Sequence, residues 1–191
     1  MAVYRINFYS GSYRQRQESA NRDQAICFVA HHLNSAGPDA NYALCVVGSN
    51  AGQKSLLWAG DYVRRVGTMF QAPLYAKSGL SIGGMSGRGN SQLVHTHMPA
   101  ILPEPLFASN PAHAKIIRSE NGRQMLAQCL AQSIQQHFPF GGLVAFSVGH
   151  QGKPAPYHLD RGAVVWGEPP YMEAQAVEDI LVRAKRLLEM P

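Results

Sequence analysis

The sequence predicts an α/β fold with one mostly parallel, twisted sheet flanked by helices. Strand-like apolar runs alternate with stretches of helical periodicity along the chain. One run, Leu143–Val148, shows no polar alternation, as expected of a strand that is covered on both faces. The 191 residues, 46% hydrophobic and 15% charged, are enough for such a sheet and exclude a disordered or fibrous chain.

In the first half of the chain, hydrophobicity alternates along Val3–Phe8, which is expected to be a strand. Residues 24–33 start with a short helical turn and run into a second strand at Ile26, and residues 42–47 form a third. Residues 54–70 have helical periodicity. Residues 77–92 are rich in glycine and serine and have no periodicity, so we expect a functional or mobile loop.

In the second half, residues 93–94 and 100–102 are expected to be short strands around Pro99. The sequence then predicts two helices, a buried strand and a closing helix with apolar residues at helical spacing, which span 111–118, 122–137, 143–148 and 171–190. We find no internal repeat and no linker between two parts. We therefore expect residues 1–191 to form a single domain.

Charge and composition restrict the function classes. The net charge of +5 comes from scattered Lys and Arg residues, so it fits a polyanionic cell wall as well as nucleic acid, for which no binding motif is present. No apolar run approaches the roughly 18 residues of a membrane span. Residues 1–8 lack the features of a signal peptide, so we expect a chain made in the cytoplasm. Cys27, Cys45 and Cys129 are sparse and odd in number, which argues against a disulfide framework and a cysteine-ligated zinc.

Four polar side chains stand where predicted strands or helices begin or end. His150 and His32 follow strands, Glu104 ends the segment after Pro99, and Glu173 lies in the first turn of the last helix. In an α/β sheet such residues meet at the carboxyl ends of the strands. Two imidazoles and a carboxylate are a usual ligand set for catalytic zinc, with a second carboxylate as the base. The alternatives are ordinary hydrogen-bonded histidines and a carboxylate that is favoured by the helix dipole.

Three segments resemble motifs of one enzyme family. Residues 98–110, Met-Pro-Ala-Ile-Leu-Pro-Glu-Pro-Leu-Phe-Ala-Ser-Asn, resemble the segment with the catalytic glutamate in zinc-dependent N-acetylmuramoyl-L-alanine amidases of phage lysins and bacterial autolysins. Residues 16–35 are similar to the family's stretch of an arginine, an Ala-Asn pair, a strand and His-x-Asn. Residues 147–173 contain Gly-His-x-Gly, Asp-x-Gly-Ala and a glutamate, and resemble its opening segment. The resemblance covers most of the chain.

This resemblance implies the chemistry. His150, Glu173 and His32 match the family's zinc ligands, and Glu104 matches its catalytic acid/base. The implied cofactor is Zn²⁺ and the implied partner is peptidoglycan, cleaved between N-acetylmuramic acid and L-alanine. Without a signal peptide or a second binding domain, the chain is expected to reach the wall as a phage-type lysin does. We do not expect nucleic acid as a partner or a membrane span.

The order of the motifs differs from that of the family. The Gly-His segment comes first in the family and last here, which indicates a circular permutation with a family-like start at about residue 142. Such a cut is physically acceptable, since chain ends commonly lie close together at the surface. Strand 143–148 is then expected in the interior of the sheet, beside the strand that begins at Val3. The covalent link would be cut between Pro191 and Met1.

Several assignments remain open at this stage. His31 is an alternative ligand to its neighbour, since adjacent residues on a strand face opposite sides, but the spacing to Asn34 favours His32. His95 and His97 are expected to have surface or supporting roles. We treat Asn34 and Arg88 as candidate substrate contacts, the arginine for a stem-peptide carboxylate. The alternative functions are a zinc hydrolase for another peptide or amino-acyl amide and an inactive wall-binding module.

Overall fold

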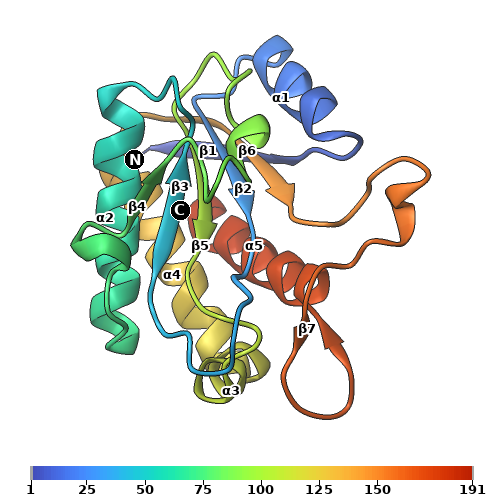
Figure 1. Ribbon diagram of the computed structural model, residues 1–191. Helices are drawn as coiled ribbons and strands as arrows, with labels where there is room; N and C mark the ends of the chain where they lie inside the picture. The colour runs from blue at the N-terminus through green and yellow to red at the C-terminus, as the bar shows by residue number, and fades with distance from the viewer. Residues whose placement is uncertain (1, 191) are drawn as a thin grey trace.

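The computed structural model describes residues 2–190 and contains one central sheet with helices on both faces (Figure 1). The strands of the six-stranded sheet are β1 (Val3–Phe8), β2 (Cys27–His31), β3 (Leu44–Val47), β4 (Leu80–Ile82), β5 (Ala100–Glu104) and β6 (Gly141–Val148). A separate two-stranded sheet pairs β7 (Val164–Val165) with β8 (Tyr171–Met172). The helices are α1 (Tyr13–Arg22), α2 (Gln53–Phe70), α3 (Pro111–Arg118), α4 (Glu120–His137) and α5 (Glu173–Glu189). No helix within residues 2–190 is long and apolar enough to cross a membrane.

The sheet order is β1-β6-β2-β5-β3-β4. The first four of these strands are mutually parallel, β3 runs antiparallel to β5, and β4 runs parallel to β3. The predicted α/β class with a mostly parallel sheet is thus confirmed. The interior position of β6 beside β1 is also confirmed, although the two strands come from opposite ends of the chain. The predicted cut between Pro191 and Met1 lies outside the described residues.

Two apolar layers hold the sheet between its helices. One contains the odd-numbered β2 residues Cys27 and Val29 together with buried side chains of α2, α4 and α5. The other is smaller and contains the even-numbered β2 residues Phe28 and Ala30, which are covered by α1 and by the segment between β4 and β5. Burial on both faces explains why β2 and β6 are nearly continuous apolar runs. Because β6, β2 and β5 are neighbouring parallel strands, their carboxyl ends meet at one edge of the sheet.

Helix α1 was not predicted as a helix. Its sequence, YRQRQESANR, offers no apolar stripe, and the side chains that it buries are Arg16, Gln17 and Ala20. The helix starts at a capping box, in which Ser12 accepts from the backbone of Gln15 and the Gln15 side chain accepts from the Ser12 N–H. A helix that buries polar groups escapes a search for hydrophobic periodicity.

Three other sequence predictions were wrong in detail. Residues 77–92 are not free of structure, because β4 lies within them and adds an edge strand to β3. Residues 93–94 are a turn and not a strand, with Leu93 N–H bonded to the Asn90 carbonyl. The last helix begins at Glu173, since residues 171–172 pair with β7 instead. Only the pairing of β4 with β3 depends on a contact distant in sequence, and the other two differences arise from local hydrogen bonds.

We expect Tyr62→Phe to leave stability unchanged or to raise it by about 1 kcal/mol. Tyr62 of α2 is fully buried, and its hydroxyl has no hydrogen-bond partner within residues 2–190. Removal of an unpaired buried hydroxyl relieves a desolvation cost. Urea unfolding measures the change, with Trp58→Phe as the control, because that variant loses the bond from Trp58 Nε1 to Ser133 Oγ and should be destabilised. A loss of more than about 1 kcal/mol in Tyr62→Phe would mean that the hydroxyl is satisfied.

Candidate metal centre

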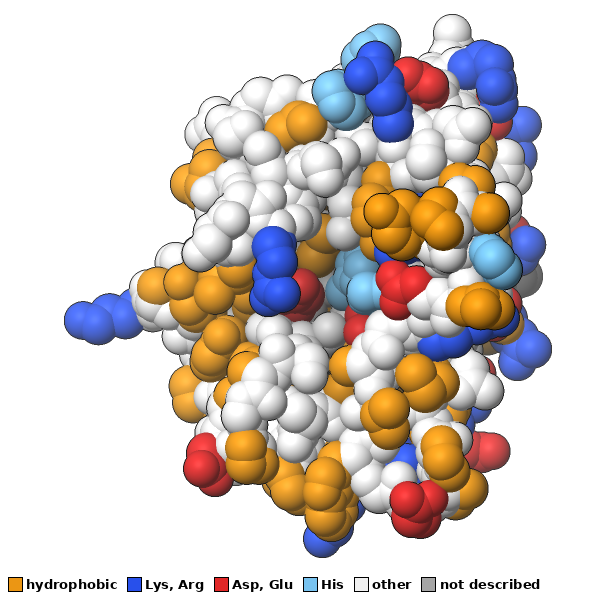
Figure 2. All heavy atoms as spheres, turned by 45° about the vertical axis from the view of Figure 1, so that its right-hand side comes forward, with side chains coloured by type: hydrophobic (Ala, Val, Ile, Leu, Met, Phe, Trp, Pro, Cys, Tyr) orange, Lys and Arg blue, Asp and Glu red, His pale blue; other side chains and the backbone are white. Residues whose placement is uncertain are grey.

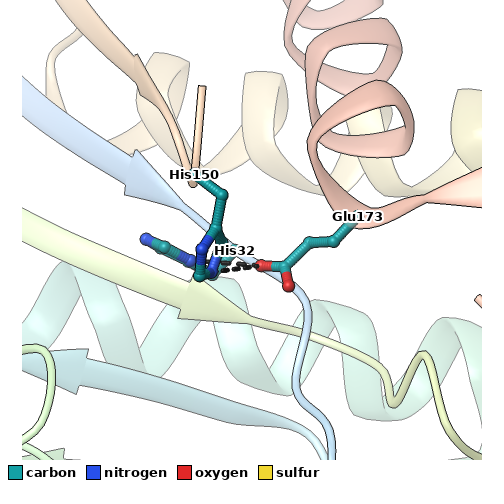
Figure 3. Close-up of side chains that lie close together, drawn as sticks. All are labelled: His32, His150 and Glu173. Carbon is teal, nitrogen blue, oxygen red and sulfur yellow. Dashed lines mark hydrogen bonds and ion pairs between the residues drawn. The ribbon is translucent and has the colours of Figure 1, made fainter. Parts of the chain in front are cut away.

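Side chains from two strand ends and one helix start meet at the edge of the sheet. His32 directly follows β2, His150 follows β6 by two residues, and Glu173 opens α5 (Figure 3). Each offers one potential ligand atom, and these three atoms lie within 4.8 Å of one another. Figure 2 shows histidine and acidic side chains together in a hollow of this face. The sequence-based grouping of these three residues matches what the structure brings together.

The hydrogen bonds of the two imidazoles orient their lone pairs toward Glu173. His32 Nε2 lies 3.0 Å from Gln92 Oε1, an acceptor, so this nitrogen carries the proton of the neutral ring. In that neutral form, the lone pair of His32 Nδ1 points toward Glu173 Oε1, 3.1 Å away. On the other ring, His150 Nδ1 donates to both oxygens of Asp160 at 2.9 Å, so the lone pair of Nε2 faces Glu173 Oε1 at 3.5 Å.

When both rings are neutral, three atoms with lone pairs thus converge, and none of them carries a hydrogen. Such a set attracts a proton or a metal cation. The pattern of a ligating histidine that donates its other N–H to a carboxylate or carbonyl oxygen is common at zinc sites. Two imidazole nitrogens and a carboxylate oxygen also fit zinc by ligand type and leave a fourth position open. The residues therefore fit a catalytic zinc ion.

Glu173 is a buried carboxylate held by backbone donors. Only 2% of the residue is exposed, and Glu173 Oε1 accepts from Leu33 N–H at 3.0 Å. The other oxygen accepts from Ala163 N–H at 3.0 Å. Burial by itself would raise the pKa of Glu173, but the hydrogen bond and the positive charge of His32 in its protonated form outweigh it and lower that pKa. The carboxylate therefore stays ionised, as a metal ligand must.

Two glycines make room for this convergence. A Cβ at Gly149 would lie 2.5 Å from His32 Nδ1 and 2.7 Å from the His31 carbonyl oxygen. A Cβ at Gly162 would lie 2.5 Å from Glu173 Oε2, and the φ of Gly162 is +74°. Both positions need glycine because the backbone passes directly against the candidate ligands.

A further ion pair supports His150. Asp160 accepts from Lys153 Nζ at 2.5 Å and from Gly162 N–H at 2.9 Å, besides the bonds from His150. Burial opposes ionisation of Asp160, but Lys153 and His150 hold the pKa of that carboxyl well below its usual range. Sequence reasoning assigned no role to Asp160, although it lies in the Asp-x-Gly-Ala segment. It also missed Gln92, which no pattern connects to a histidine 60 residues away.

Glu104 lies at the carboxyl end of β5, beside the three candidate ligands but outside the group that they form. Burial raises the pKa of Glu104, while the nearby charges of His32 and Arg88 lower it and that of Glu173 raises it. The His32 N–H bonds to the Pro103 carbonyl at 3.0 Å, so Glu104 follows directly after a residue that is bonded to a candidate ligand. A half-buried carboxylate with a raised pKa suits proton transfer near neutral pH.

The two candidate substrate residues lie on different segments, Arg88 between β4 and β5 and Asn34 after β2. Arg88 is exposed and ends a tight turn, in which its N–H and carbonyl pair with Met85. Asn34 is half-buried, and its backbone bonds to Leu106 and Ala108, so it joins the segment after β2 to the segment after β5. Its Oδ1 accepts from the backbone of Ser35 at 2.9 Å.

The remaining histidines lie apart from the centre. His31 is fully buried, and neither nitrogen of its ring has a hydrogen-bond partner within residues 2–190. Burial, together with the neighbouring His32, lowers the pKa of His31 to about 3. His95 and His97 are exposed, and their backbones bond to the α1 side chains Gln17 and Asn21. Among the described residues, only His32 and His150 contribute imidazoles to the candidate centre.

Comparison with known proteins connects this geometry to a family. The family described as N-acetylmuramoyl-L-alanine amidase matches residues 3–136. This chain belongs to that family. The matched stretch contains His32 and Glu104, whereas His150 and Glu173 lie beyond it. Curated protein sequences give no match.

Solved amidase structures share the fold. An N-acetylmuramoyl-L-alanine amidase from Clostridium difficile 630 is 22% identical with a TM-score of 0.57, over 67% of this chain and 66% of that one. The catalytic domain of the amidase CwlV from Bacillus (Paenibacillus) polymyxa var. colistinus is 22% identical with a TM-score of 0.56, over 68% and 66%. The amidase Ami1 from Mycobacterium smegmatis is 17% identical with a TM-score of 0.54, over 65% and 59%. The match thus spans 59–66% of the length of these solved chains, which is less than two thirds.

Proposed function

We propose that this protein is a zinc-dependent hydrolase of the amide bond between N-acetylmuramic acid and L-alanine in peptidoglycan. One observation carries the proposal: in a member of the amidase family, two imidazole lone pairs and a buried carboxylate converge within 4.8 Å. His32, His150 and Glu173 would hold the metal. Bound there, zinc supplies Lewis acidity toward the amide carbonyl and lowers the pKa of water.

Glu104 is the residue that moves the proton in this proposal. It stands beside the ligands without belonging to them, and its pKa is raised by burial. Its carboxylate accepts a proton from the attacking water and passes it to the nitrogen of the departing L-alanine. The amide C–N bond breaks, the lactyl group leaves as a carboxylic acid and the stem peptide leaves as an amine.

The substrate is expected to lie along the hollow in Figure 2. The exposed guanidinium of Arg88, beside Glu104, is suited to a carboxylate of the stem peptide. Asn34 offers a polar side chain on the neighbouring segment. The net charge of +5 matches a polyanionic wall. The protein would then act on the cell wall after release from the cell, in the manner of a phage lysin.

The experiment that tests this function uses purified peptidoglycan. The zinc-loaded protein is expected to release new α-amino groups of L-alanine, which are identified by dinitrophenylation, without releasing reducing sugars. No new L-alanine termini from peptidoglycan, together with hydrolysis of other peptide amides, would indicate a zinc hydrolase of different specificity. Zinc binding without any hydrolysis would indicate an inactive wall-binding module.

We further propose that the chain is a circularly permuted amidase, with residues 1–191 as its catalytic domain and the family-like start at about residue 142. Support comes from the parallel pairing of β6 with β1 and from the packing of α5 against both strands. The family match ends at residue 136, before this segment.

A chain with the family's motif order is expected to fold and to bind one zinc ion. In this variant, a flexible Gly/Ser linker joins the present ends, and new ends are opened beside Phe140, whose side chain is 95% exposed. The contacts of the core are unchanged, because only the connection moves. Circular dichroism and zinc analysis measure the outcome. An unfolded variant would indicate that the present connection at residues 138–142 is essential to the fold.

Arg88→Ala is expected to raise KM for peptidoglycan roughly 5-fold, which corresponds to about 1 kcal/mol for a solvent-exposed charge contact. Turnover should change little, because the contact is the same in substrate and transition state. Arg64→Ala is the matched control, since it removes the same charge from an exposed position on α2. Equal KM values for wild type and Arg88→Ala would rule out the proposed contact.

A further inference from the structure

Arg16 of α1 is a cation in the interior of the protein. None of its surface is exposed, and its guanidinium is surrounded by neutral acceptors. Burial lowers the pKa of Arg16 from its usual value. Isolation of a charge from water is costly unless hydrogen bonds compensate for it. The identity of those acceptors therefore indicates what the charge does.

The acceptors lie around the turn that carries His150. Arg16 Nη1 donates to the Val148 carbonyl at 2.7 Å and to Ser147 Oγ at 2.8 Å. Its Nη2 donates to the carbonyl of Gln151. One guanidinium thus binds the carbonyls on both sides of Gly149–His150. Its Nε donates to Gly11 at 2.9 Å, which ties the turn to the start of α1.

The turn itself is strained at the candidate ligand. His150 has a φ of +60°, in the left-handed region that is unfavourable for a residue with a Cβ. Gly149 has no space for a side chain, and its N–H is held by the His31 carbonyl at 2.9 Å. A strained segment persists only where its surroundings hold it. Asp160 holds the His150 ring, and Arg16 holds the backbone carbonyls on either side of Gly149 and His150.

We propose that Arg16 is a positioning residue of the metal centre, which holds the turn 148–151 so that His150 Nε2 faces Glu173 and His32 before a metal binds. This proposal rests on the zinc centre of the proposed function. A preorganised ligand set binds its metal more tightly, because the free energy of binding is not used to order the loop. The planar fork of arginine bridges acceptors that the single ammonium of lysine cannot.

The test measures zinc affinity and the geometry of the centre in Arg16→Lys and Arg16→Met. Competition with a chromophoric chelator gives the zinc Kd, which is expected to rise about 10-fold or more in both variants, as for other residues that support metal ligands. Cobalt substitution adds a spectroscopic measure, since loss of the His150 ligand should alter the visible absorption of Co²⁺. Trp58→Phe is the control for lost stability, because Trp58 is buried in α2, bonds to Ser133 of α4 and, within residues 2–190, has no hydrogen bond to the turn at His150.

The outcomes separate the proposal from its alternatives. Arg16→Lys variants that are folded by circular dichroism and bind zinc and cobalt as the wild type does would overturn it. Arg16 variants that stay unfolded even in saturating zinc would also overturn it, since Arg16 would then be a residue of the fold. Equal loss of affinity in Trp58→Phe would assign the effect to general instability. A wild-type protein that binds no zinc would instead contradict the proposed function itself.

Discussion

Glu104→Gln is expected to lower turnover on peptidoglycan by about 10²-fold or more while the protein keeps its zinc. The amide has the shape of the carboxylate but cannot accept a proton from water. Glu104 lies next to the three candidate ligands and is not one of them, so the metal should remain. Steady-state rates, with zinc content measured on the same preparation, give the result.

The metal content decides how a loss of activity in Glu104→Gln is interpreted. Loss of zinc would make Glu104 a ligand and would reverse the assigned roles. Full activity with zinc retained would mean that another group moves the proton. Arg88→Ala is a useful companion, because it changes the charge beside Glu104 without removing the carboxylate.

His32→Ala is expected to abolish both stoichiometric zinc binding and activity, whereas the wild type binds one zinc ion per chain and loses activity on chelation. His32 Nδ1 is one of only three potential ligand atoms that converge at the centre in residues 2–190. Two remaining protein ligands do not make the usual catalytic site of three. Elemental analysis and activity before and after re-addition of zinc measure both effects.

The neighbouring histidine provides the matched control. His31→Leu removes an imidazole that is equally buried, one residue away, and whose nitrogens have no partner. It should keep zinc and activity, and its stability should be unchanged or higher, since an unpaired buried polar ring is lost. The reverse result, with zinc lost in His31→Leu and kept in His32→Ala, would transfer the ligand role to His31.

Much of the fold could be predicted from the chain itself. β1, β6 and the last helix were expected nearly where they lie, because period-two alternation, an unbroken apolar run and helical spacing each leave a local trace. Helix α1 and strand β4 left none. The first buries polar side chains, and the second is a three-residue edge strand that is paired with β3.

The candidate site divides in the same way. His150, Glu173, His32 and Glu104 could be grouped because all four stand at the ends of elements whose ends meet. The choice between His31 and His32 was left to motif spacing, and the structure shows the first ring in the apolar layer and the second beside Glu173. Gln92, Asp160 and Arg16 support the centre across distances in sequence that no local pattern records.

The sequence by itself determined the α/β class, the interior strand at residues 143–148 and the residue types of a metal site, because periodicity and ligand chemistry are local properties. Only the tertiary structure decided which histidine faces the centre, which nitrogen of each ring points inward and what holds the turn at His150. Those features depend on hydrogen bonds between segments as far apart as Arg16 and Gln151, and on glycines that make room for atoms of distant residues. These groups are distant in sequence and come together only through the packing of the folded chain.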